Sequence, residues 1–183
     1  MTIAEILKIN PLTLEMGAGI HPRMDRSKGW LFNDLMALPG IDLVAPCDNL
    51  GLPPNSVSKL YCAHLIEHIP SDLIPKTLAY WYGLLRHEGS LEILCPSCDY
   101  AMRVFLKHSD EDKVPPAMIY RCIWGTRDAG TEALPPHNFH HVGFTKSLLK
   151  IYLSKMGFVN IVVKDFNRFG IPDRDIYAIA YKD

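Results

Sequence analysis

The sequence has no long hydrophobic run, no excess of charge of one sign, no internal repeat and no low-complexity tract. No apolar stretch approaches the roughly 20 residues that a membrane-spanning helix needs, which argues against a membrane protein. Lysine and arginine total 19 against 20 aspartate and glutamate, a formal net charge of -1. Such a balance argues against a partner as acidic as nucleic acid. We therefore expect a protein that binds neither membrane nor nucleic acid.

The beginning of the sequence lacks the basic stretch and the long apolar core of a signal peptide. Its five cysteines are odd in number and lie mostly inside apolar runs, which is typical of buried thiols in a reducing compartment. We therefore expect a cytoplasmic protein. With 183 residues, 48% hydrophobic and 21% charged, the chain has the balance of one folded domain, expected to span residues 1–183. No feature predicts an oligomeric state.

The hydrophobic pattern alternates between strand-like and helix-like segments. Short apolar runs predict strands at residues 12–16, 30–34, 41–45, 57–63, 91–95, 159–166 and 176–181. Apolar residues at spacings of three and four predict helices at 71–86, 99–107, 118–124 and 146–156, with N-caps at Ser71 and Thr145 and stops at Gly89 and Gly157. This order predicts a doubly wound, mostly parallel α/β sheet with a C-terminal antiparallel pair of strands. The less regular segment 97–141 is expected to cover the active site.

A glycine turn follows the first predicted strand. Gly17, Ala18 and Gly19 lie where, in an open α/β sheet, the backbone and a ligand approach closely. A dinucleotide site would have a further glycine at the position of Pro22, and a long first helix for which the basic loop 23–28 leaves little room. A structural turn explains many such sequences. If the turn binds a ligand, a nucleoside without a pyrophosphate fits better.

Two carboxylates follow the next two predicted strands. Asp34 ends the second strand, where a carboxylate can accept hydrogen bonds from both ribose hydroxyls. Asp48 follows the third strand, within reach of an adenine amino group. Each carboxylate alone could also serve as a turn or capping residue, so their joint spacing is what favours a nucleoside site.

These residues resemble the successive motifs of class I S-adenosylmethionine-dependent methyltransferases, and in particular a compact branch of that family. The resemblance covers nearly the whole chain and is carried by the segments 14–22 (LEMGAGIHP), 29–34 (GWLFND), 48–50 (DNL), 54–57 (PNSV), 64–68 (HLIEH), 84–89 (LLRHEG) and 140–145 (HHVGFT). It implies the fold of that family, S-adenosylmethionine as the cofactor, and methyl transfer to a small-molecule or sugar-type acceptor.

The resemblance also implies roles for individual residues. It assigns Glu15, Gly17, Ala18 and Gly19 to the methionine part of the cofactor, Asp34 to the ribose, Asp48 and Asn49 to the adenine, and His64 to the pocket lining. In this reading segment 97–141 is the acceptor-side cover.

Methyl transfer from a sulfonium draws its reactivity from the cofactor, so the protein mainly supplies orientation and a water-poor pocket. If the acceptor is a hydroxyl, a base helps, and histidine has a suitable pKa. We hypothesise that His140 or His64 faces the acceptor; the alternative is that each only caps a helix or fixes a loop.

Three alternatives remain open. His64, Glu67 and His68 have the spacing of a zinc hydrolase in which two histidines of one helix bind the metal, although Pro70 leaves little room for that helix. Cys95 and Cys98 form a CxxC pair with Cys122 and His137 as further candidates, for which two ordinary thiols is the favoured interpretation. The chain could also be a non-catalytic binding module. The favoured site contains no metal.

Overall fold

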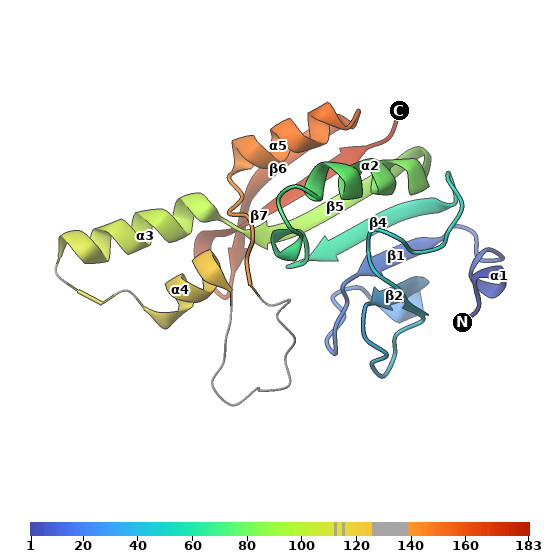
Figure 1. Cartoon of the computed structure of the whole chain (residues 1–183), viewed down its shortest axis with the longest axis horizontal. Coiled ribbons are helices and arrows are strands. Elements are labelled where there is room, and N and C mark those ends of the chain that lie inside the picture. Colours follow the sequence, from blue (N-terminus) through green and yellow to red (C-terminus); the bar gives the residue numbers. More distant parts are fainter. Residues whose placement is uncertain (112, 115, 126–138) are drawn as a thin grey trace.

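A computed structural model describes residues 1–111, 113–114, 116–125 and 139–183 (Figure 1). Its centre is a seven-stranded sheet in the order β3-β2-β1-β4-β5-β7-β6. The strands are β1 (Thr13–Met16), β2 (Trp30–Asp34), β3 (Leu43–Val44), β4 (Val57–Ala63), β5 (Leu85–Pro96), β6 (Val159–Arg168) and β7 (Ile171–Tyr181). Strands β1 to β5 pair in parallel, whereas β7 is antiparallel to both β5 and β6. The predicted α/β sheet with its C-terminal antiparallel pair is confirmed.

Helices flank this sheet unevenly. They are α1 (Ile3–Ile6), α2 (Ile74–Leu84), α3 (Cys98–Asp110), α4 (Ala117–Trp124) and α5 (Lys146–Lys155), with the short 3-10 helices η1 (Arg26–Lys28) and η2 (Ile66–His68). Only η1 lies between β1 and β2, as the short basic loop predicts. Helices α2 and α5 lie side by side over the sheet, while α3 and α4 extend away from the end of β5 (Figure 1). No helix in the described part of the chain is both long and apolar enough to cross a bilayer.

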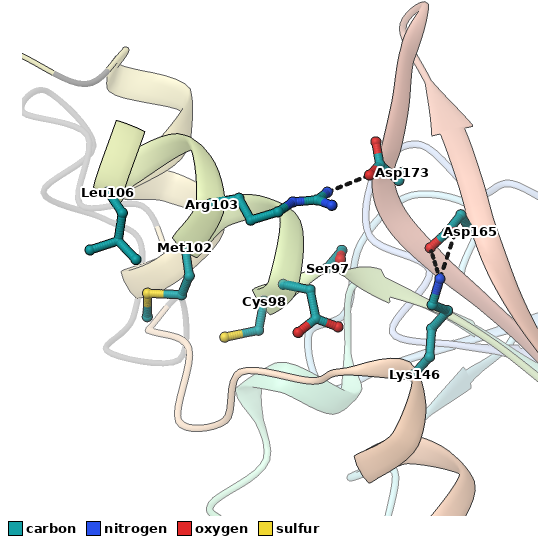
Figure 2. A pocket seen from close by; sticks show the side chains of 9 residues that line it. Ser97, Cys98, Met102, Arg103, Leu106, Lys146, Asp165 and Asp173 are labelled. Carbon is teal, nitrogen blue, oxygen red and sulfur yellow. Dashed lines mark hydrogen bonds and ion pairs between the residues drawn. The ribbon is translucent and has the colours of Figure 1, made fainter. Parts of the chain in front are cut away.

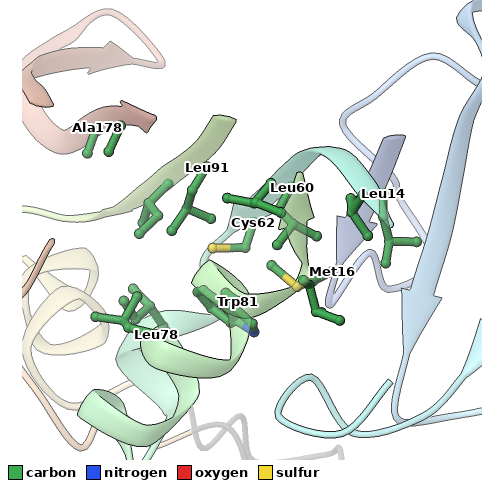
Figure 3. Close-up of a cluster of buried hydrophobic side chains, with 14 of the residues drawn as sticks. Leu14, Met16, Leu60, Cys62, Leu78, Trp81, Leu91 and Ala178 are labelled. Carbon is green, nitrogen blue, oxygen red and sulfur yellow. The ribbon is translucent and has the colours of Figure 1, made fainter. Parts of the chain in front are cut away.

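The core lies between the sheet and helices α2 and α5. The strand register places Leu14, Leu60 and Leu91 side by side on one face. Trp81 of α2 is fully buried against this face, and its indole N–H donates to the Cys47 carbonyl at 2.8 Å (Figure 3). Since side chains alternate along a strand, Glu15 lies on the opposite face, and this alternation separates the apolar core from the polar positions of β1.

Helix boundaries agree with the prediction where a local signal sets them. The Thr145 side chain accepts from the Leu148 N–H and caps α5, and Gly157 follows α5 with φ of 92°. The predicted cap at Ser71 is wrong, because α2 starts later, with Leu73 as an N-cap that makes no side-chain hydrogen bond. The predicted stop at Gly89 is also wrong: α2 ends at Leu84 and the chain enters β5 directly.

Two irregularities explain why β5 and β7 are longer than expected. The register of β4 against β5 shifts between Val57 and Lys59, so residues 86–89 form a bulge inside β5, where a Cβ on Gly89 would lie 2.8 Å from the Arg86 carbonyl oxygen. Strands β6 and β7 are joined by Phe169 and Gly170 alone, both with positive φ. Such a two-residue turn matches the twist of a hairpin. The two strands therefore continue beyond the apolar runs 159–166 and 176–181 and pair up to the turn.

Candidate functional site

The glycine turn leaves β1 at the predicted place. Gly17 and Gly19 have φ of 63° and 61°, a left-handed conformation that favours glycine. A Cβ on Gly17 would lie 2.9 Å from the Leu65 side chain, whereas a Cβ on Gly19 would meet nothing within 4 Å. Between them, the Ala18 N–H donates to the Asn33 carbonyl at 2.9 Å. The turn is therefore fixed on the β4 side and open at Gly19.

Asp34 contacts this turn directly. Its Oδ2 accepts from the Gly19 N–H and its Oδ1 accepts from the Met36 N–H, each at 2.9 Å. The carboxylate therefore ties the end of β2 to the turn after β1. A carboxylate has about four acceptor positions, so Asp34 can accept further hydrogen bonds.

Glu15 is buried on β1, and its carboxylate binds backbone. It accepts from the Arg23 N–H at 2.9 Å with both oxygens, and from the Met24 N–H at 2.8 Å. Burial raises the pKa of Glu15 above 4.5, against the lowering effect of these hydrogen bonds. The observed contacts show Glu15 holding the loop that follows the turn, a role that the sequence did not suggest.

Asp48 and Asn49 lie in the loop after β3. Asp48 is half-buried and Asn49 is exposed, and the Asn49 N–H donates to the Pro46 carbonyl in a tight turn. The neighbouring Cys47 and Leu50 are bound to α2 through Trp81 and Tyr80. No hydrogen bond among the described residues links Asp48 or Asn49 to the glycine turn, so the structure does not bring these two predicted residues into contact with Asp34.

The strand order reverses next to β1. From β1 the sheet continues to β2 and β3 on one side and to β4 and β5 on the other, and in open α/β sheets ligands bind outside the carboxyl ends of the strands at such a point. The glycine turn after β1 and His64 after β4 flank this position. The His64 N–H donates to the Leu94 carbonyl at 2.8 Å, and its φ of 53° turns the chain away from the sheet.

His64 joins a group of buried charges. Its Nδ1 lies 3.1 Å from Glu67 Oε1, and its Nε2 lies 3.3 Å from Asp175 Oδ2 and contacts Arg168 Nη1. Asp175 is fully buried, and Arg174 Nη1 lies 3.8 Å from its Oδ1. These charges meet because the start of β7 lies beside the carboxyl end of β5.

The pKa values in this group shift in the directions of an ion pair. Burial opposes ionisation of both His64 and Asp175. The hydrogen bonds to Asp175 and Glu67 outweigh it and raise the pKa of His64. The hydrogen bond to His64 and the nearby arginines likewise lower the pKa of Asp175 below 3.8.

His140 also lies close to Glu67. Its Nδ1 lies 3.0 Å from the Cys122 carbonyl oxygen, and its ring centroid lies 4.9 Å from that of His68 at an interplanar angle of 74°. Burial lowers the pKa of His140 below 6.5. One ligand atom each from Glu67, His68 and His140 lies within 4.8 Å of the other two. The structure therefore brings the two histidines predicted to face an acceptor, His64 and His140, to the same glutamate.

A separate cavity of about 520 Å³ lies between α3, the start of α5 and the β6–β7 hairpin. Figure 2 shows Arg103 pointing to Asp173 and Lys146 to Asp165, with Cys98 and Met102 on the other side. Lys146 Nζ lies 2.6 Å from Asp165 Oδ2. The cavity contains none of the predicted cofactor-binding or catalytic residues, and its two basic side chains, Arg103 and Lys146, are paired with Asp173 and Asp165.

The helix that the zinc-hydrolase alternative would need over residues 64–68 does not form. His64 has a left-handed backbone and only residues 66–68 are helical, in η2, so the two histidines do not lie on one helix. All five cysteines are free; Cys95 is fully buried in β5 and Cys98 is half-buried in the first turn of α3. Burial raises the pKa of both thiols, which favours ordinary thiols. His137 lies outside the described residues.

Sequence reasoning missed Arg168, Arg174 and Asp175. They belong to the hairpin β6–β7, in the residues 167–175 that lie between the two predicted strands 159–166 and 176–181. The only signal was a charge cluster between two apolar runs, and such clusters are usually exposed.

No known family model matches the chain, and no curated protein is similar to it in sequence. Solved structures do match. An S-adenosylmethionine-dependent methyltransferase from Archaeoglobus fulgidus superposes with a TM-score of 0.66 at 13% identity, over 98% of this chain and 89% of that one. A possible histamine N-methyltransferase from Thermotoga maritima gives 0.65 at 14%, over 99% and 87%.

A third match carries ligands. The 1,6-didemethyltoxoflavin-N1-methyltransferase of Burkholderia thailandensis, with bound 1,6-didemethyltoxoflavin and S-adenosylhomocysteine, gives a TM-score of 0.64 at 15% identity, over 98% of this chain and 76% of that one. The chain is thus structurally similar over nearly its full length to many S-adenosylmethionine-dependent methyltransferases and has their class I fold.

Proposed function

We propose that the chain binds S-adenosylmethionine at the glycine turn and catalyses methyl transfer to a small-molecule or sugar-type acceptor. The observation that carries this proposal is the bond between the turn and the end of β2, where the Gly19 N–H donates to Asp34 Oδ2 at 2.9 Å beside the point at which the strand order reverses. The class I fold supports the same cofactor.

The residues at this point fit an adenosyl group. The space beside Gly19 is open, since an added Cβ would meet nothing within 4 Å. Asp34 retains acceptor positions that ribose hydroxyls could fill. Asp48 and Asn49 would lie toward the adenine, and Glu15 would hold the loop that borders the methionine part by its bonds to Arg23 and Met24.

The bound cofactor would supply an electrophilic methyl group on a sulfonium. The chain itself then has to orient the acceptor and exclude water, which accounts for much of the rate of such displacements. Segment 97–141, which contains α3 and α4, would form the acceptor-side cover, and His64 and His140 would face the acceptor from the group around Glu67.

The net charge of the chain and one structural neighbour both support a small acceptor. The chain has a net charge of -1, which offers little attraction to a polyanion. The Burkholderia thailandensis neighbour binds 1,6-didemethyltoxoflavin, a small molecule. An acceptor of similar size is therefore part of the proposal for this chain.

Calorimetric titration with S-adenosylhomocysteine tests the cofactor. We expect one molecule bound per chain and an affinity at least tenfold lower in Asp34→Asn, because the amide has only one acceptor oxygen for the turn and the ribose. Asp42→Asn is the matched control: the Asp42 carboxylate also accepts from a backbone N–H, that of Phe32 at 2.9 Å, but makes no hydrogen bond to the turn in the described structure. Absence of binding to the wild type, or equal losses in both variants, would contradict the proposal.

Turnover is tested separately by following S-adenosylhomocysteine release with a panel of small acceptors. His140→Ala should reduce turnover without weakening cofactor binding. Cofactor binding with no turnover on any acceptor would favour the non-catalytic binding module.

A further inference from the structure

The group around Glu67 contains a buried oxygen without a partner. Glu67 is 1% exposed, and its Oε1 is bound to His64 Nδ1 at 3.1 Å. Its Oε2 has no hydrogen-bond partner in the described structure. A buried carboxylate oxygen left unpaired is costly, and native structures rarely keep one unless an ion or a water molecule satisfies it.

Two imidazoles, those of His68 and His140, each have a ligand atom within 4.8 Å of one of this carboxylate's oxygens, and hydrogen bonds fix their tautomers. His68 Nδ1 is 3.1 Å from the Phe139 carbonyl oxygen, and His140 Nδ1 is 3.0 Å from the Cys122 carbonyl oxygen. A carbonyl only accepts, so in each neutral ring the proton is on Nδ1 and the lone pair on Nε2. Metal-binding histidines are held in this way, with the second ring nitrogen donating to a backbone carbonyl or carboxylate.

The backbone also brings the three residues together. Glu67 and His68 lie in η2, and the His141 N–H donates to the Glu67 carbonyl at 2.8 Å, which fixes segment 139–141 beside η2. The candidate ligand atoms lie within 4.8 Å of one another. A tetrahedral ion with bonds of about 2.1 Å keeps its ligand atoms roughly 3.4 Å apart, so small side-chain rotations suffice to close the site.

We propose that Glu67, His68 and His140 bind one divalent transition-metal ion, with Zn²⁺ as the reference ion. Two nitrogen ligands and one carboxylate favour such an ion over Mg²⁺ or Ca²⁺, which prefer oxygen ligands. Three protein ligands leave at least one coordination position open, as in catalytic zinc sites. His64 acts outside the ligand set, by orienting Glu67 through Oε1. The site departs from the metal-free site that the sequence predicts and uses His140 where the zinc motif would use His64.

The open position gives the ion a place in catalysis, and this part of the inference rests on the proposed function. An acceptor hydroxyl bound there would release its proton to water more easily, because a bound cation stabilises the oxyanion. The oxyanion would then form a bond to the methyl carbon as the bond from that carbon to the sulfonium breaks, which leaves S-adenosylhomocysteine. His140 would then hold the ion and not act as the base itself.

Metal binding is tested directly on chelator-treated full-length protein by calorimetric titration with Zn²⁺, Mn²⁺ and Mg²⁺, and by metal analysis after dialysis. We expect one Zn²⁺ per chain, bound more tightly than Mg²⁺. His68→Gln and His140→Gln should each weaken binding at least 100-fold. His108→Gln is the matched control, because His108 also has its Nδ1 against a backbone carbonyl, that of Val104 at 2.8 Å, but belongs to no ligand group in the described structure.

Folding is checked by circular dichroism and thermal unfolding in chelator, where the variants should behave like the wild type. A second readout is the visible absorption of bound Co²⁺, expected in the wild type and His108→Gln and lost in His140→Gln. Absence of stoichiometric Zn²⁺ in the wild type, undiminished binding in both ligand variants, or preference for Mg²⁺ would overturn the proposal. Titration of the metal-free protein with S-adenosylhomocysteine shows separately whether the cofactor proposal stands.

Discussion

The two ends of the candidate site differ in how their buried charges are satisfied. Beside the glycine turn, Glu15 and Asp34 each accept backbone N–H groups with both oxygens. Beyond β4, buried atoms of Glu67, Arg168, Arg174 and Asp175 have no hydrogen-bond partner in the described structure. In the first region backbone N–H groups satisfy the carboxylates, and the turn is open beside Gly19. The second keeps unused hydrogen-bonding capacity, which indicates where a ligand would be bound by side chains.

The largest effect on stability is expected in the second region. Asp175→Asn should lower the free energy of unfolding by about 3 kcal/mol, because it leaves Arg168 and Arg174 facing a neutral group in a buried position. Asp173→Asn is the control: Asp173 pairs with Arg103 at the surface, so the loss should stay below about 0.5 kcal/mol. Urea unfolding of both variants measures the difference, and equal losses would contradict it.

The Asp175 effect should also depend on pH. Its folded pKa lies below the unfolded value of 3.8, so the ionised carboxylate stabilises the fold above that value and the contribution is lost as the pH falls through the folded pKa. The gap between wild type and Asp175→Asn should therefore be full at pH 6 and narrow below about pH 4. A gap that widened in acid would exclude this ion pair.

A smaller loss is expected from Glu15 in the first region. Glu15→Ala should cost about 2 kcal/mol, since the Arg23 and Met24 N–H groups lose their acceptor. The pH dependence has the opposite sign to that of Asp175: the pKa of Glu15 is raised above 4.5, so its stabilising contribution is full below that value and falls as the pH rises through the folded pKa. Glu15→Gln, which does not titrate, should gain stability relative to wild type between pH 4 and pH 7, as thermal unfolding at both values would show.

Substitutions of the two turn glycines should affect stability and cofactor binding in opposite orders. Gly17→Ala should cost about 2 kcal/mol and Gly19→Ala about 1 kcal/mol, because both have positive φ but only Gly17 is crowded by Leu65. S-adenosylhomocysteine binding should show the reverse order, since a Cβ on Gly19 enters the open space. If Leu65→Ala failed to reduce the cost of Gly17→Ala in a double-mutant cycle, crowding would not be the cause.

The sequence predicts best what depends on neighbouring residues. Thr145 and Gly157 bound α5 because a cap and a left-handed turn are local, and the glycine turn follows β1 for the same reason. Ser71 was predicted as a cap because of its residue type, but the helix begins later. In such cases packing of the apolar stripe, here around Trp81, decides the boundary.

The second region could not be predicted because distant segments build it. The zinc pattern of His64, Glu67 and His68 would need one helix, yet the left-handed backbone at His64 keeps it off η2. His140, which follows α4 in the sequence, contacts His68 instead. Asp175 is buried because β7 starts only two residues after β6 ends and pairs Asp175 with Pro96 at the end of β5. Neither event leaves a pattern among adjacent residues.

The central claim is that the region at the glycine turn binds the cofactor and the region around Glu67 binds a metal ion. It is tested most directly by a crystal structure of the chain with S-adenosylhomocysteine and Zn²⁺, with anomalous data at the zinc edge. We predict the nucleoside beside Gly19 with its ribose on Asp34, and one zinc peak bound by Glu67, His68 and His140. A nucleoside bound elsewhere would contradict the proposed function, and a zinc peak away from these three residues would contradict the proposed metal site.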